Sequence, residues 1–193
     1  MKPLSRPVQY GLLAAFALLM VATRFHHFGT ALHLPDASMA LFFLGGLYLR
    51  RHWQFVVFMG LAVAIDWVAI EHAGVSDFCV TPAYSFLLPA YAVLWYGGRW
   101  YSPRLQMQWK NLAGAVAVAL ACASVSFAIS NGAFYWLGGR YENPHMAQYL
   151  ARAWQWGPLF VRTTMTYIVV ALAIHAIAAS SLQLRAGRRP ADT

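Results

Sequence analysis

The stretch QFVVFMGLAVAIDWVAI, residues 54–70, decides the fold of this chain. It carries one charged residue, Asp66, in 17 positions. A helix that crosses the hydrocarbon core of a bilayer needs about 20 predominantly apolar residues, with a range of roughly 17–25. The stretch therefore predicts a membrane-spanning helix.

The composition of the whole chain extends this prediction to a multi-pass membrane protein. Among 193 residues, 60% belong to the AVILMFWYC set and only 10% are charged, whereas about 25% are charged in a typical soluble domain. So few charges cannot cover the surface of a soluble domain of this size. The two cysteines, Cys79 and Cys122, provide no disulfide framework, which excludes a small secreted module.

The apolar runs predict an all-α integral membrane protein with a single transmembrane domain over residues 1–193. The six expected spans are residues 8–23, 37–49, 54–70, 78–96, 112–130 and 159–180. The second segment is shorter than a span requires. It either crosses the membrane fully or re-enters on the same side.

The Lys and Arg residues predict the orientation of the spans, because they mark the cytoplasmic side of membrane proteins. Ten of the 14 fall on one side: Lys2, Arg6, Arg50, Arg51, Arg99, Arg104, Lys110, Arg185, Arg188 and Arg189. Arg24, Arg140 and Arg152 fall on the other side, and Arg162 lies in the last span. Both termini are therefore expected in the cytoplasm. The net charge of +8 is mainly an orientation signal and does not indicate a nucleic-acid partner.

The external connection 131–157 contains a helical pattern. Asn143-Pro144 is typical of a helix start, and apolar residues then recur at helical spacing, namely Met146, Tyr149, Leu150, Ala153 and Trp154. We expect a short amphipathic helix here. With its aromatic neighbours, it forms either an interfacial aromatic belt or a lid over a flat apolar ligand.

Asp66 is the only acid within an apolar run. A carboxylate at the centre of a span costs about 2.5–3.5 kcal/mol and indicates a function by default. Asp66 lies near the external end of its helix, where the cost is smaller. Arg162, near the same side in the last helix, is the expected partner. Pairing with Arg162 and contact with a ligand are both open, and they are compatible.

Cys79 lies just before the fourth predicted helix, where Thr81-Pro82 is typical of an N-cap followed by the first helical residue. The positive end of a helix dipole favours the thiolate form of a nearby cysteine, although Asp77 opposes this. A thiolate there suits soft or borderline metals. Cys122, in mid-helix, is expected to be a small buried hydrophobe. Pro89 is expected to kink the fourth helix.

Three histidines, His26, His27 and His33, cluster in the first external loop. Solvation is the common outcome for such residues, and they also suit a metal, haem or a corrinoid. The HExxH, GxSxG, P-loop and Rossmann motifs are absent from the sequence. The chain therefore carries no site for hydrolysing ATP.

The chain resembles the BtuM family, the vitamin B12-specific substrate-binding components (S-components) of energy-coupling-factor (ECF) transporters. The resemblance rests on six short helices, cytoplasmic termini and four residues in or beside external loops. The four residues are His27, Asp66, Cys79 and Tyr84. The most specific part of the resemblance is the stretch D-F-C-V-T-P-A-Y, residues 77–84.

The resemblance implies a six-helix S-component bundle in the bacterial inner membrane that binds cobalamin from the periplasmic side. Cys79 would be the axial ligand of the cobalt, in place of the vitamin's own benzimidazole base. His27, Asp66 and Tyr84 would help to line the site. The protein would be a transporter and not an enzyme. Loss of cyanide from cyanocobalamin is a secondary hypothesis, because a strong donor on one face of the cobalt loosens the ligand on the other.

The sequence of the first helix does not decide whether the protein has a partner beyond cobalamin and the lipid bilayer. S-components dock on an ECF energising module through small residues of that helix, and Gly11 and Ala15 match this pattern loosely. The pair Ala14 and Leu18 departs from it. Both a docked and a solitary protein are therefore compatible with the sequence.

Three other functions compete with this interpretation. The first is a small membrane thiol or haem oxidoreductase that uses Cys79 and His27, although no CxxC pair is present and only His175 lies within a span. The second is an S-component for another vitamin, which leaves Cys79 without a metal to bind. The third is a structural or assembly protein whose external polar residues are solvated.

Overall fold

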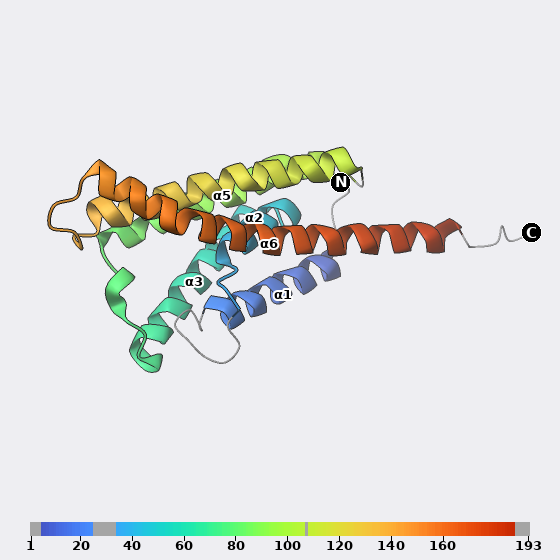
Figure 1. Ribbon diagram of the computed structural model, residues 1–193. Helices are drawn as coiled ribbons and strands as arrows, with labels where there is room; N and C mark the ends of the chain where they lie inside the picture. The colour runs from blue at the N-terminus through green and yellow to red at the C-terminus, as the bar shows by residue number, and fades with distance from the viewer. Residues whose placement is uncertain (1–4, 25–33, 107, 188–193) are drawn as a thin grey trace, which may run out of the picture.

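The computed structural model describes residues 5–24, 34–106 and 108–187, and of residues 182–187 it describes the backbone only. Within these ranges the chain forms six α-helices and three short 3-10 helices (Figure 1). The elements are α1 Arg6–Arg24, α2 Ser38–Tyr48, α3 His52–Ala73, η1 Asp77–Cys79, η2 Pro82–Phe86, α4 Leu87–Tyr101, η3 Ser102–Arg104, α5 Trp109–Leu137 and α6 Met146–Gly187. The predicted all-α fold is confirmed.

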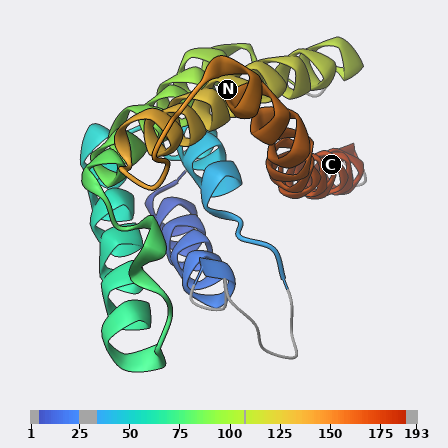
Figure 2. The same ribbon diagram turned by 60° about the vertical axis from the view of Figure 1, so that its left-hand side comes forward.

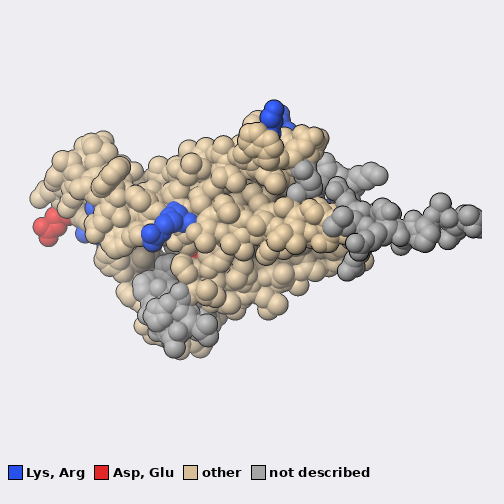
Figure 3. Space-filling view, turned by 45° about the vertical axis from the view of Figure 1, so that its right-hand side comes forward, with Lys and Arg blue, Asp and Glu red and all other residues tan. Residues whose placement is uncertain are grey.

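Four of the helices, α1, α3, α5 and α6, are long and apolar enough to cross a membrane. α4 has 15 residues and continues directly from the five residues of η2. The face of the molecule in Figure 3 has few charged side chains along its length, as expected for a surface in contact with lipid. The chain is therefore a multi-pass membrane protein by the length and composition of its helices.

The short helix α2 lies in the centre of the bundle, with α1, α3, α4 and α6 around it (Figure 2). Its 11 residues extend over about 16 Å, at 1.5 Å per residue, which is about half the thickness of the hydrocarbon core. Phe42, Phe43 and Leu47 are fully buried. Because protein rather than lipid surrounds it, α2 does not need the length of a lipid-exposed helix.

The closest helix crossing joins α2 to α4. A methyl group at Gly46 would overlap the backbone oxygen of Trp95, and one at Gly98 would overlap that of Phe43. The two glycines therefore allow the backbones to touch. Above this crossing, the rings of Phe42 and Tyr91 stack with centroids 4.2 Å apart. The contact fixes the position of α4, which carries Tyr91 toward the candidate site.

The segment predicted as one span over residues 78–96 is broken into η1, η2 and α4. Thr81 and Pro82 do begin a helix, as predicted, but it is the 3-10 helix η2, and α4 begins only at Leu87. Pro89 lies in the first turn of α4, where no intrahelical N–H bond is required. Pro89 therefore removes no hydrogen bond from the interior of α4, which was the reason for predicting a kink.

The connection expected over residues 131–157 is much shorter in the structure. α5 continues to Leu137 and α6 begins at Met146, so the expected separate amphipathic helix is the first part of α6. Both helices extend because their ends pack on each other: the rings of Tyr135 and Tyr149 lie 5.5 Å apart, and the Tyr135 hydroxyl donates to Gln148 Oε1 at 2.6 Å. α6 consequently has 42 residues.

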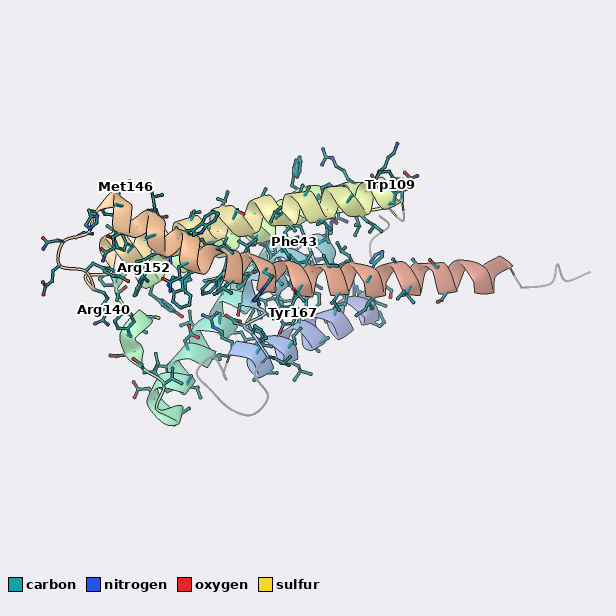
Figure 4. All side chains as sticks on the ribbon, in the orientation of Figure 1. Phe43, Trp109, Arg140, Met146, Arg152 and Tyr167 are labelled. Atoms are coloured by element: carbon teal, nitrogen blue, oxygen red, sulfur yellow. The ribbon has the colours of Figure 1, made fainter. Side chains whose placement is uncertain are left out.

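The two ends of the bundle differ in charge. One end, the basic end, carries Arg50, Arg51, Arg99, Arg104 and Lys110. At the opposite end, called the outer end here, residues 74–86 run across the bundle between α3 and α4 (Figure 1), and residues 138–145 connect α5 to α6. Figure 4 shows Arg140, Met146 and Arg152 together at the outer end and Trp109 at the basic end.

Candidate ligand-binding site

A buried ion pair occupies the bundle near the outer end. Arg24, the last residue of α1, donates to both carboxylate oxygens of Asp66 on α3, from Nε at 2.6 Å and from a terminal nitrogen at 2.6 Å. The Tyr84 hydroxyl of η2 donates to the same carboxylate at 2.6 Å. Bidentate pairs of this kind are among the strongest hydrogen bonds in proteins. Asp66 and Tyr84 are thus held together.

The predicted partner of Asp66 was wrong. Arg162 is exposed on α6 and forms no ion pair within the ranges that the structure describes. Arg24 takes its place because α1 packs against α3, whereas the Arg162 side chain lies on the outer face of α6. The sequence predicts that both arginines lie near the same side of the membrane, but it does not predict the direction of their side chains.

The Arg24 guanidinium has further partners that connect it to α2 and α4. Its Nη1 donates to the Ser38 hydroxyl at 3.1 Å and to the Tyr91 hydroxyl at 2.9 Å, and it lies 3.5 Å from Asp36. The Arg24 side chain is only 8% exposed. A charge at this depth is tolerated because every side-chain nitrogen has a partner. The cluster therefore joins four helices at one point.

A cavity of about 270 Å³ opens beside this cluster. Asp66, Cys79 and Tyr84, three of the four predicted site residues, all line it. Its apolar wall comes from α3, α4, α5 and α6 and includes Ala69, Ile70, Leu87, Phe127, Phe134 and Phe160. The result is a mainly apolar cavity with several polar groups, among them Ser130 and Asn131 of α5, which is the usual composition of a site for a small molecule.

Cys79 lines this cavity from η1, outside the spanning helices. Desolvation raises the pKa of the Cys79 thiol above its ordinary value, the Asp66 carboxylate adds to this rise, and the Arg140 guanidinium opposes it. The sequence predicts that a helix dipole favours the thiolate. Burial and the Asp66 carboxylate act in the opposite direction, and the residues after Thr81 form the 3-10 helix η2, which continues into α4.

Arg140, in the connection between α5 and α6, holds the Cys79 segment in place. Its Nε donates to the Phe78 carbonyl oxygen at 3.1 Å, and its guanidinium carbon lies 4.9 Å from the centroid of the Phe78 ring. The sequence predicts only the side of the membrane on which Arg140 lies. The contact joins residues 62 positions apart, so no local pattern could have indicated it.

The fourth predicted site residue, His27, lies outside the described residues, as do His26 and His33. In the part of the chain that the structure describes, no group of three or more His, Cys, Asp and Glu side chains is placed to hold a metal ion. No protein-family model matches this chain, and no curated protein matches it.

Proposed function

We propose that this protein binds vitamin B12, or a related corrinoid, at its outer end and carries it into the cell. In this proposal the Cys79 thiolate is the axial ligand of the substrate's cobalt. The observation that carries the proposal is that Cys79, Asp66 and Tyr84, from three separate elements, line one cavity. Their common location is required by the function and does not follow from their order in the chain.

A corrinoid suits the donor set of this cavity. The corrin ring supplies four nitrogen ligands to its cobalt, so a single protein donor completes one axial position. A thiolate is a strong donor for a metal of intermediate softness. The aromatic and aliphatic wall suits the flat ring, and the polar cluster around Asp66 suits the amide groups at its edge. The cavity volume of about 270 Å³ accommodates part of such a ligand, and the rest extends beyond these walls.

The binding step exchanges ligands on cobalt without a change of oxidation state. The Cys79 thiol releases its proton to the medium, and the sulfur forms a bond to cobalt. The benzimidazole nitrogen leaves the cobalt and keeps its electron pair. Because burial raises the pKa of the Cys79 thiol above its ordinary value, the neutral thiol is favoured over the reactive thiolate before the substrate arrives.

The test is to measure cobalamin binding and the visible spectrum of the bound vitamin with purified protein. Replacing Cys79 by Ala or Ser is expected to weaken binding at least about tenfold, which corresponds to about 1.4 kcal/mol, and to remove the spectral change that a sulfur ligand causes. Cys122→Ala is the matched control, because Cys122 lies within α5 and does not line the cavity. If the spectrum of cobalamin bound to the Cys79→Ala variant equals that of the wild type, Cys79 is not the cobalt ligand.

Transport is tested by growth of a bacterial strain that depends on external cobalamin and lacks its own importer. The wild-type chain is expected to restore growth, alone or together with an ECF energising module, and the Cys79→Ala chain is not. If the protein binds cobalamin but restores growth neither alone nor with the energising module, its function is limited to binding.

Decyanation is a consequence of the same ligand exchange. A strong sulfur donor weakens the cobalt–carbon bond on the opposite face, so cyanide leaves with its electron pair and takes up a proton from the medium. Incubation of cyanocobalamin with the wild-type protein is expected to release cyanide, whereas the Cys79→Ala variant releases none. A cyano-form spectrum that persists with the wild type would contradict this step.

A further inference from the structure

A second cavity, of about 380 Å³, adjoins the Cys79 cavity. It lies between the start of α2 and the outer parts of α4, α5 and α6. The two cavities share five lining residues, Asp36, Leu87, Tyr91, Ser130 and Phe160. A ligand bound beside Cys79 is therefore separated from the second cavity by only one layer of side chains.

The wall of the second cavity is mainly apolar and partly aromatic. Met39, Ala90, Leu159 and the rings of Tyr91, Trp156 and Phe160 contribute to it. Flat heterocycles bind well between such groups, because ring stacking adds to the burial of apolar surface. The volume also falls in the range of roughly 300–1,000 Å³ found for small-molecule sites.

Ser126 is the most informative polar residue in this wall. It is 1% exposed and lines the cavity from α5, and among the residues that the structure describes its hydroxyl has no hydrogen-bond partner. By contrast, the hydroxyl of Thr164, in the same wall, donates to the Phe160 carbonyl oxygen at 2.9 Å. The Ser126 hydroxyl oxygen is not one of the fully buried side-chain atoms without a partner, so it is accessible at the surface of the cavity. Ser126 therefore offers a free donor to a ligand that carries a hydrogen-bond acceptor.

We propose that the second cavity binds the benzimidazole base that Cys79 displaces from the cobalt, with the Ser126 hydroxyl donating a hydrogen bond to the released ring nitrogen. This inference rests on the proposed binding of corrinoids. When the cobalt–nitrogen bond breaks, the ring nitrogen keeps its electron pair and needs a donor. Ser126 offers one in a cavity of suitable size and wall chemistry, next to the site where the bond breaks.

The experiment compares two corrinoids by isothermal titration calorimetry on the purified full-length protein. Cobalamin carries the base on its nucleotide arm, and cobinamide lacks that arm. Ser126→Ala is expected to lower the affinity for cobalamin about fivefold, the value of one hydrogen bond, and to leave the affinity for cobinamide unchanged. Thr163→Phe, which fills the cavity from α6, is expected to lower the affinity for cobalamin about tenfold and to spare cobinamide.

The matched control is Ser124→Ala. Ser124 lies on the same helix but is exposed, and its hydroxyl donates to the Leu120 carbonyl oxygen at 2.9 Å. This variant is expected to bind both corrinoids as the wild type does. Cobinamide binding also shows that each variant is folded.

Two results would overturn the inference while leaving the proposed function intact. The first is a wild-type affinity for cobalamin in both the Ser126→Ala and the Thr163→Phe variants. The second is an equal loss of affinity for cobalamin and cobinamide in both variants. A wild-type protein that binds neither corrinoid would overturn the proposed function, and this inference with it.

Discussion

Arg24 and Asp66 are 42 residues apart in the chain and form a two-point ion pair, with both hydrogen bonds at 2.6 Å. The pair joins the end of α1 to α3, and the Tyr84 hydroxyl joins η2 to the same carboxylate. The cavity that contains Cys79 depends on this arrangement, because Arg24, Asp66 and Tyr84 all line it. Stability and the geometry of the site are therefore coupled at this pair.

We expect Arg24→Gln to lower the free energy of unfolding by about 3 kcal/mol. This is near the lower end of the range for breaking a buried pair, because the Asp66 side chain is 24% exposed. Denaturant unfolding in detergent measures the loss. Arg162→Gln is the control, and it is expected to change the stability by less than about 0.5 kcal/mol. Equal stability of the Arg24 and Arg162 variants would contradict the assignment of the pair.

We expect Gly46→Ala and Gly98→Ala to disrupt the crossing of α2 and α4. Each added methyl group meets a backbone oxygen of the facing helix, and a backbone cannot move aside as a side chain can. Overpacking costs about 1–3 kcal/mol or more. The thermal midpoint and the yield of folded protein in detergent report the effect.

Gly60→Ala on α3 is the control for these variants, because nothing lies within 4 Å of the added methyl group. It is expected to be neutral or to stabilise the protein by up to about 1 kcal/mol, the difference in helix propensity. If Gly46→Ala behaves as Gly60→Ala does, the two helices are not in direct contact.

We expect Arg140→Ala to loosen the segment that carries Cys79. The variant removes the hydrogen bond to the Phe78 carbonyl oxygen and the contact with the Phe78 ring. Hydrogen–deuterium exchange over residues 76–80 should become faster, while the global stability changes by less than about 1 kcal/mol, because Arg140 is exposed.

Arg104 provides a matched control for Arg140 at the basic end. It makes the same two contacts with Trp100: a hydrogen bond to the carbonyl oxygen at 3.0 Å and a guanidinium 4.5 Å from the ring. Arg104→Ala should leave exchange over residues 76–80 unchanged. Similar exchange in both variants and the wild type would show that Arg140 does not hold the segment.

We expect Cys79 to react with a membrane-impermeant maleimide added to intact cells, in a Cys122→Ala background. Cys79 is exposed at the outer end. A second variant carries a cysteine in place of Gln108, which is exposed at the basic end, and has Cys79 replaced by Ala. Its cysteine should react only after the membrane is permeabilised. The opposite labelling pattern would reverse the orientation predicted from the Lys and Arg residues.

The apolar runs were sufficient to predict the class of the fold and the approximate position of each helix. They predicted helix ends poorly, as residues 131–157 illustrate. There the helices continue beyond the apolar runs because Tyr135 of α5 and Tyr149 of α6 pack against each other. Contacts between helices set these ends, and hydropathy along a single chain contains no information about such contacts.

The amino-acid sequence alone predicted an all-α membrane protein and singled out Asp66 and Cys79, because a carboxylate in an apolar run and a cysteine before a helix start are visible as local patterns, whereas Tyr84 was singled out only by the family resemblance. The sequence did not establish that Arg24 rather than Arg162 pairs with Asp66, that Arg140 holds the Cys79 segment, or that Ser126 faces a second cavity. Each of these depends on the rotation of a helix about its axis and on its neighbours in the bundle. Packing between distant segments sets both, and only the folded chain brings those segments together.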